Sequence, residues 1–159
     1  MTSSWLPAAE SPSPAAQRWS QIELRATVVT DGPIVPSTLD GFGTLVRQLA
    51  IGQHPAEEVW VAAVDGSQIR AISMTARGQY HAVQVALPAI LAVPLLAGCA
   101  QLTVLHTHPS SVLTPSAEDI ELTRLVAAAA NTCGLLLADH LIVARDGRMA
   151  SLRRLGHLV

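Results

Sequence analysis

The stretch that decides the fold is LTVLHTHPSSVLTPSAED, residues 102–119. Its apolar first part predicts a buried strand, and His106 and His108 follow directly. Residues two apart on a strand point to the same side, so both imidazoles can reach one point in space. Asp119 comes after a Pro- and Ser-rich loop that can fold the chain back. Two neutral imidazoles and one carboxylate form a ligand set of the catalytic zinc type, with the fourth position left for water.

Each of these residues also has a plainer interpretation. His106 and His108 could be ordinary histidines whose ring nitrogens are satisfied by hydrogen bonds. The pattern Ser116-x-x-Asp119 before an apolar run is typical of a helix cap, in which the serine hydroxyl and the acid each bind a backbone N–H. Capping and metal binding are compatible for Ser116, but they compete for the carboxylate of Asp119. The sequence leaves both interpretations open.

Hydrophobic periodicity predicts strands and helices that alternate loosely along the chain. The expected strands are residues 22–29, 57–64, 69–76, 102–105, 141–144 and 149–152, with hairpin turns at Asp65-Gly66-Ser67 and Asp146-Gly147. The expected helices are residues 38–50, a segment beginning near Leu87-Pro88 that Pro94 should kink or stop, and residues 116–133, whose apolar stripe is Leu122, Val126, Ala129 and Cys133. This pattern predicts a mixed α/β fold, with helices packed on a largely antiparallel sheet.

Composition limits the classes of function. Half of the 159 residues are apolar, only 14% are charged, the net charge is −2, and no basic run is present. A nucleic-acid footprint would show as clustered Lys and Arg, so we expect no direct nucleic-acid binding. Cys99 and Cys133 lie in no CxxC pair, which favours two buried thiols in a reducing compartment and a cytoplasmic location.

The ends of the chain and one uncharged segment set the expected domain limits. Residues 1–19 are rich in Ser, Pro and Ala, which predicts a flexible tail before one domain over residues 20–159, with no secretory signal. The segment 82–105 has no charged side chain and is long enough to span a bilayer. Its glutamines, prolines and glycine favour a buried helix followed by a buried strand, so we expect no membrane span.

Two further groups of polar residues are candidates for a site. Glu57 and Glu58 begin a predicted strand, so their side chains face opposite sides, and one could enter a cleft while the other meets solvent. The plainer alternative is a charged strand end, which the sequence by itself favours. Asp139-His140 could orient a metal ligand, or could be a loop with a buried histidine.

The motif His106-x-His108, seven residues, Ser116, two residues, Asp119 resembles the JAMM motif of JAB/MPN metalloproteins. The segments His106-Thr107-His108-Pro109-Ser110 and Thr114-Pro115-Ser116 look most like the RadC-like branch of that family, as do Arg77-Gly78 and Asp139-His140. The similarity covers residues 22–155. Ser111 departs from the pattern, because the branch has glycine there, and the loop backbone is therefore expected to differ.

The resemblance implies an α/β fold of the JAB/MPN, cytidine deaminase-like kind, and one Zn²⁺ ion held by His106, His108 and Asp119. It also implies a metallopeptidase or isopeptidase that acts on a peptide or protein, including ubiquitin-like proteins. Glu57 fits the register of the family's general base, with Glu58 as the fallback, and Ser116 would help to bind the water or the oxyanion. The alternatives are a non-catalytic JAB/MPN interaction module and a DNA-repair-associated accessory protein. The oligomeric state does not follow from the sequence.

Overall fold

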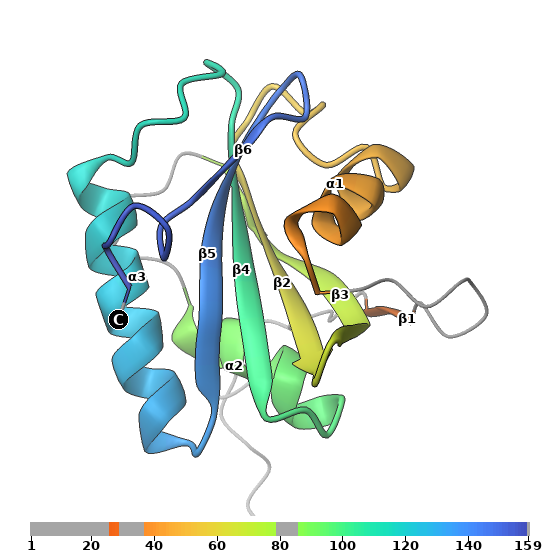
Figure 1. The fold of residues 1–159 in the computed structure, drawn as a ribbon, viewed down its shortest axis with the longest axis vertical. Coiled ribbons are helices and arrows are strands. Elements are labelled where there is room, and N and C mark those ends of the chain that lie inside the picture. Colours follow the sequence, from red (N-terminus) through yellow and green to blue (C-terminus); the bar gives the residue numbers. More distant parts are fainter. Residues whose placement is uncertain (1–25, 29–36, 79–85, 159) are drawn as a thin grey trace, which may run out of the picture.

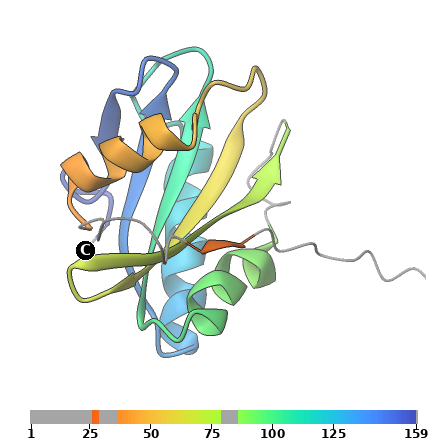
Figure 2. The same cartoon turned by 90° about the vertical axis from the view of Figure 1, so that its right-hand side faces the viewer.

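The protein has three layers in the computed structural model, which describes residues 26–28, 37–78 and 86–158. A mixed sheet forms the middle layer, α1 covers one face, and α2 and α3 cover the other (Figures 1 and 2). The strands are β1 (Ala26–Val28), β2 (Glu58–Asp65), β3 (Gln68–Arg77), β4 (Gln101–His108), β5 (Leu136–Ala144) and β6 (Met149–Ser151). The helices are α1 (Leu39–Gln48), α2 (Leu87–Leu96) and α3 (Ala117–Thr132). The predicted α/β class, with helices on a mixed sheet, is confirmed.

The sheet has the strand order β1-β3-β2-β4-β5-β6 over the described residues. Only β4 and β5 pair in parallel, and the other neighbours are antiparallel. Antiparallel neighbours can be joined by tight turns, as β2 and β3 are at Gly66-Ser67, whereas parallel neighbours need a long crossover. Helix α3 supplies that crossover, so β4, α3 and β5 form one βαβ unit at the centre of the molecule.

Alternation along β4 divides the core into two clusters, one on each side of the sheet. Leu102 and Val104 pack in the cluster that includes α2 and α3, and Leu105 packs in the cluster that includes α1. The same alternation carries His106 and His108 to the α3 side. The fold therefore fixes which helix can meet the histidines.

Two predicted strands are longer than their sequence patterns indicated. Strand β4 continues through His108 instead of ending at Leu105, and β5 begins at Leu136 instead of Leu141. Both extensions follow from the parallel pairing of these strands, in which Gln101 lies opposite Leu136 and His108 opposite Ala144. The possibility that Asp139-His140 lies in a loop is therefore wrong, because both residues lie inside β5.

The helices also correct two details. Helix α2 continues through Pro94 to Leu96, although the proline lacks the N–H that would bond the carbonyl of Ile90, and the helix ends two residues later. The thiol of Cys133 is exposed, contrary to the prediction, and Cys99 is buried. Cys133 is the C-cap of α3, and the fully buried position in that last stretch is Ala130. Gly134 ends the helix as expected, with φ +72°.

Some predictions fall on residues that the structure does not describe. The tail 1–19 lies outside the described residues, and of the first strand only Ala26–Val28 is described. In the part of the uncharged segment that is described, α2 and β4 are separate elements. No helix among the described residues has the length and apolar character that crossing a membrane requires.

Candidate metal centre

Strand β4 positions the two histidines. It lies between β2 and β5, and Val59 of β2 and Ile142 of β5 are the Cα partners of His106. His106 is 8% exposed, and its ring meets the ring of His108 edge-on, with centroids 4.9 Å apart. Hydrogen bonds to the neighbouring strands β2 and β5 hold the backbone of His106, so the side-chain torsions alone set the direction of its imidazole.

Asp119 comes from the first turn of α3. Ser116 is the N-cap of this helix, and its hydroxyl accepts a bond from the Asp119 N–H at 3.1 Å. In return, Asp119 Oδ2 accepts bonds from the backbone N–H and the hydroxyl of Ser116, both at 2.8 Å. This is a complete capping box, and it fixes the direction of the carboxylate.

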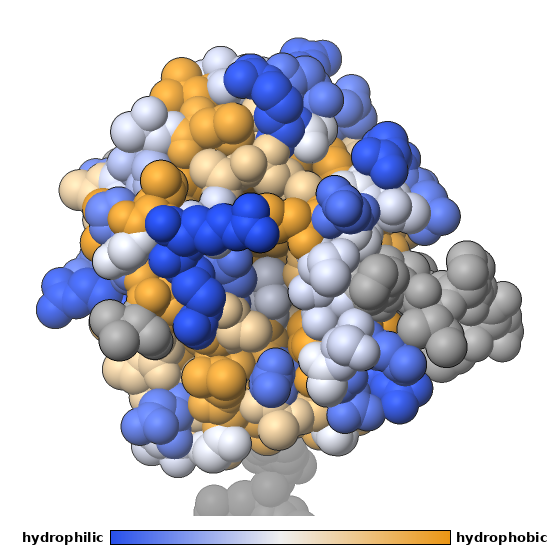
Figure 3. All heavy atoms as spheres, viewed as in Figure 1, coloured by the Kyte–Doolittle hydropathy of each residue, from blue (hydrophilic) through white to orange (hydrophobic). Residues whose placement is uncertain are grey.

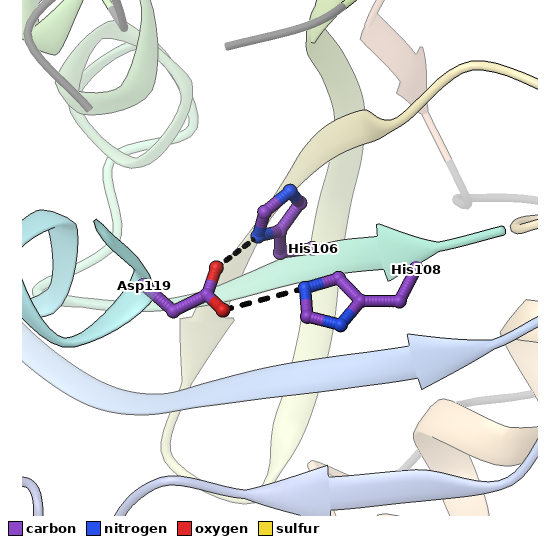
Figure 4. A group of neighbouring side chains, drawn as sticks. All are labelled: His106, His108 and Asp119. Carbon is purple, nitrogen blue, oxygen red and sulfur yellow. Dashed lines mark hydrogen bonds and ion pairs between the residues drawn. The ribbon is translucent and has the colours of Figure 1, made fainter. Parts of the chain in front are cut away.

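The carboxylate meets both imidazoles while it caps the helix (Figure 4). Asp119 Oδ1 lies 2.6 Å from Nδ1 of His106, and Oδ2 lies 3.3 Å from Nε2 of His108. One ligand atom of each residue lies within 4.8 Å of the others. The two oxygens of Asp119 remove the expected competition between helix capping and metal binding. Oδ2 makes the capping hydrogen bonds, and Oδ1 makes none of them.

The donor set fits a zinc ion. Two imidazole nitrogens and a carboxylate oxygen are ligand types that zinc accepts. Nε2 of His106 is buried and makes no hydrogen bond to any described residue. A buried ring nitrogen without a hydrogen bond is uncommon in a folded protein, and a metal ion would satisfy one that carries a lone pair.

The electrostatics of the group favour an ionised aspartate. Burial raises the pKa of Asp119, but hydrogen bonds with His106, His108 and the Ser116 N–H more than offset this, so the pKa lies far below its ordinary value. The hydrogen bond with Asp119 raises the pKa of His108, and burial opposes that rise. A carboxylate that stays charged at neutral pH is ready to bind a cation.

Glu57 and Glu58 lie in different environments. Glu57 Oε2 lies 3.5 Å from Nε2 of His106, and the side chain is 36% exposed. The Glu58 side chain is 3% exposed and forms an ion pair with Arg77 at 2.7 Å. It also accepts a hydrogen bond from the Trp60 indole at 3.0 Å. Of the two glutamates, Glu57 is therefore the one placed near the histidines. The possibility that the other meets solvent is wrong, because Glu58 is buried and paired with Arg77.

Glu57 and the three potential metal ligands border an open cavity of about 460 Å³. Its size lies within the usual range of small-molecule sites, roughly 300–1,000 Å³. Most of the residues that line it are polar or acidic: Glu57, His106, His108, Ser110, Val112, Thr114, Ser116, Glu118 and Asp119. Ser116 lines the cavity, but its hydroxyl proton points to Asp119 Oδ2.

The Asp139-His140 pair has two separate roles in the structure. Asp139 accepts bonds from the His140 N–H, the Ser151 hydroxyl and the Arg153 N–H. His140 is fully buried, and its ring stacks toward that of His106 with centroids 6.2 Å apart. The pair makes no hydrogen bond to His106, His108 or the Asp119 side chain, so it does not orient a ligand in the way that the sequence suggested.

Thr123 is a residue of this region that sequence reasoning missed. Its hydroxyl donates to the backbone carbonyl of Asp119 at 2.7 Å and lies 2.7 Å from Nδ1 of His140. Since the hydroxyl has one proton, His140 must donate Nδ1–H to it. The sequence signal that could have identified Thr123 is its polar side chain directly after Leu122, a member of the apolar stripe of α3.

Comparison with known proteins shows the family of this chain. A family model described as the RadC-like JAB domain matches residues 40–157. The chain belongs to this family. The chain is 30% identical to a UPF0758 protein of Porphyromonas gingivalis over 129 residues, which cover 80% of this chain and 53% of the relative. It is 29% identical to a UPF0758 protein of Roseiflexus over 110 residues, which cover 62% of this chain and 47% of the relative.

A third relative is the UPF0758 protein of Chloroflexus aurantiacus, which is 32% identical over 90 residues, covering 57% of this chain and 39% of the relative. The RadC-like JAB domain therefore spans about half, or less, of the curated relatives that it matches. The names of these relatives state no activity, so they support the family and not a reaction.

Proposed function

We propose that this RadC-like JAB domain is a zinc-dependent hydrolase that cleaves peptide or isopeptide bonds. The observation that carries the proposal is the convergence of His106, His108 and Asp119 in an open cavity that Glu57 also lines. A non-catalytic interaction module would need neither the three potential ligands nor an acid beside them. The intact set therefore favours catalysis over scaffolding.

His106, His108 and Asp119 would hold the metal. A zinc ion bound there would supply Lewis-acid chemistry and lower the pKa of a water molecule toward about 7. The protein contributes the ionised carboxylate and two rings that the strand and the capping box keep in place. The buried position of His106 and Asp119 limits competition from bulk water.

Glu57 is proposed as the general base. It is the cavity-lining acid near Nε2 of His106, and part of its side chain reaches solvent. Its carboxylate would take a proton from the attacking water and return that proton to the leaving amine. Glu58 is unsuited to this role, since its carboxylate is already bound by Arg77 and Trp60.

Ser116 is proposed to stabilise the tetrahedral oxyanion. Its hydroxyl lines the cavity and now donates to Asp119 Oδ2. Rotation of the hydroxyl proton away from Asp119 would free it to donate to an oxyanion, a type of interaction worth roughly 3–4 kcal/mol in other hydrolases. The substrate we expect is a peptide or protein, including ubiquitin-like proteins, and a cytoplasmic location fits the two free cysteines.

The test combines metal content with turnover. We expect wild type to retain zinc and cleave a member of a panel of peptide and ubiquitin-like fusions, and His106→Ala to lose the zinc. Glu57→Gln should keep zinc and lose at least about 100-fold in turnover, the usual contribution of a general base. Glu121→Gln, an exposed acid of α3, is the matched control and should behave as wild type.

Two results would contradict the proposal. Equal cleavage by wild type and Glu57→Gln would remove Glu57 from the mechanism. Purified wild type that holds no zinc, even after zinc is added, would refute the metal centre and the hydrolase together.

A further inference from the structure

We propose that Thr107 is a positioning residue that holds Glu57 beside His106, and its part in catalysis rests on the proposed hydrolase. Hydrophilic side chains gather on the surface of the molecule, as on the face that Figure 3 shows, but Thr107 is fully buried. It lies in β4 between the two histidines and does not line the cavity of the metal centre. Burying a hydroxyl is costly unless it is hydrogen-bonded, so the partner of this hydroxyl indicates its role.

The partner of Thr107 lies at the start of β2. Oγ1 of Thr107 accepts a hydrogen bond from the Glu58 N–H at 2.8 Å, and this bond is buried. Val59 and His106 are the last Cα partners of β2 and β4 on this side, so Glu58 has no Cα partner in β4. The Thr107 side chain therefore extends the pairing of the two strands by one residue, toward Glu57.

The same peptide group is held from the side of β3. The carbonyl of Glu57 accepts the N–H of Gly78, the residue after β3, at 2.9 Å. This carbonyl and the Glu58 N–H belong to one peptide group, which is planar and rigid. Two hydrogen bonds, one from Thr107 and one from Gly78, thus fix both sides of the plane that connects Glu57 to β2.

The side-chain contacts of Glu58 cannot replace these two bonds. Arg77 and the Trp60 indole bind the Glu58 carboxylate at 2.7 and 3.0 Å, which fixes its side chain. They leave rotation about the N–Cα bond of Glu58 possible, and this rotation would swing the preceding peptide group together with Glu57. The hydrogen bond to Thr107 opposes that rotation.

The first test compares Thr107→Val with wild type and needs no substrate. Valine has nearly the shape of threonine but no hydroxyl, so the Glu58 N–H loses its acceptor. In the metal-free full chain, a nuclear Overhauser contact between the Glu57 side chain and the His106 ring reports the 3.5 Å approach of Oε2 to Nε2. We expect wild type and Thr107→Ser to show this contact. Thr107→Val should lose it, and hydrogen exchange at the Glu58 N–H should become at least about tenfold faster.

The second test uses turnover of a panel substrate that wild type cleaves. Thr107→Val should keep its zinc and its KM but lose at least about tenfold in kcat, since misplacing a group by about 1 Å can cost about 100-fold. In the Glu57→Gln background the same change should have no further effect, because Thr107 acts through Glu57. Thr107→Ser should recover most of the loss.

The matched control is Thr75→Val. The Thr75 hydroxyl donates to the carbonyl of Val59 at 3.1 Å, so this variant also removes a threonine bond to the backbone of β2. It leaves the peptide group between Glu57 and Glu58 untouched and should keep both the contact and the turnover. The amide spectrum of each variant reports that it is folded. If the valine variant does not fold, Thr107→Cys, whose sulfur is a weak acceptor, should show a weakened contact.

Three outcomes would overturn the proposal: rapid exchange of the Glu58 N–H in wild type, an unchanged contact in Thr107→Val, or the same loss of contact in Thr75→Val. If Thr107→Val loses the contact but wild type cleaves nothing, the positioning of Glu57 stands and the hydrolase falls. If wild type cleaves a substrate and Thr107→Val matches its kcat, the hydrolase stands and this proposal falls.

Discussion

At the scale of single residues, the carboxylate of Asp119 serves two structures at once. Oδ2 closes the capping box of α3, and Oδ1 meets His106. The helix start therefore sets the position of a potential metal ligand. A change that weakens the cap would move the carboxylate, and a change in the carboxylate would weaken the cap.

Ser111 provides a test of backbone strain at the same scale. Its φ is +61°, in the left-handed region where glycine is preferred, and its N–H binds the carbonyl of His108 at 2.9 Å. The RadC-like branch has glycine here, and the φ shows that serine occupies a glycine-like conformation. We expect Ser111→Gly to raise the free energy of unfolding by up to about 1 kcal/mol and Ser111→Val to lower it. Urea unfolding measures both, and a destabilising glycine together with a neutral valine would contradict the strain.

At the scale of elements, Thr123 and His140 connect α3 to β5. Thr123→Val removes the group that accepts Nδ1–H of His140, which leaves a buried donor unpaired and should cost about 1–3 kcal/mol of unfolding free energy. Thr123→Ser keeps the hydroxyl and should recover most of this loss. Urea unfolding of the metal-free protein is the measurement.

A matched control for this prediction lies on the same helix. Thr132 makes the same bond to the carbonyl four residues earlier, Ala128, but is exposed. Thr132→Val should change stability by less than about 0.5 kcal/mol. Equal losses at positions 123 and 132 would show that the bond to His140 contributes nothing.

The elements also show what the sequence could predict. The cap at Ser116 and the stop at Gly134 defined α3 because both signals are local. The grouping of the two histidines with Asp119 followed from strand alternation and loop length. The start of β5 could not be predicted in this way, since Leu136 joins the sheet only through its parallel pairing with β4. The contact between Thr123 and His140 depends on that same long-range pairing, so a local pattern could mark Thr123 as unusual but could not indicate His140 as its partner.

At the scale of the whole molecule, the buried His140 makes stability depend on pH. Burial, followed by the nearby charge of His106, lowers the pKa of His140 to about 3, against 6.5 for an unperturbed histidine. Between these values the unfolded chain binds the extra proton, so stability falls as the pH drops below about 6.5. His108, whose pKa is raised, acts in the opposite direction, because its contribution is lost as the pH rises through that pKa.

A variant isolates the contribution of His140. In metal-free protein, His140→Leu should reduce the slope of unfolding free energy between pH 4 and 6 by up to about 1.4 kcal/mol per pH unit, the value for one proton. Thr132→Val, which changes no titratable group, should leave the slope unchanged. Identical slopes for wild type and His140→Leu would mean that His140 is not neutral in the folded protein.

The two thiols differ in solvent accessibility, and this difference allows selective labelling. Burial raises the pKa of Cys99, which makes it slow to react, whereas Cys133 is exposed at the C-terminal end of α3. A maleimide dye or nitroxide should therefore attach at Cys133 alone, without engineered cysteines. The label would sit one helix length, roughly 20 Å, from Asp119, close enough to report paramagnetic relaxation from the far end of α3 without touching the metal centre.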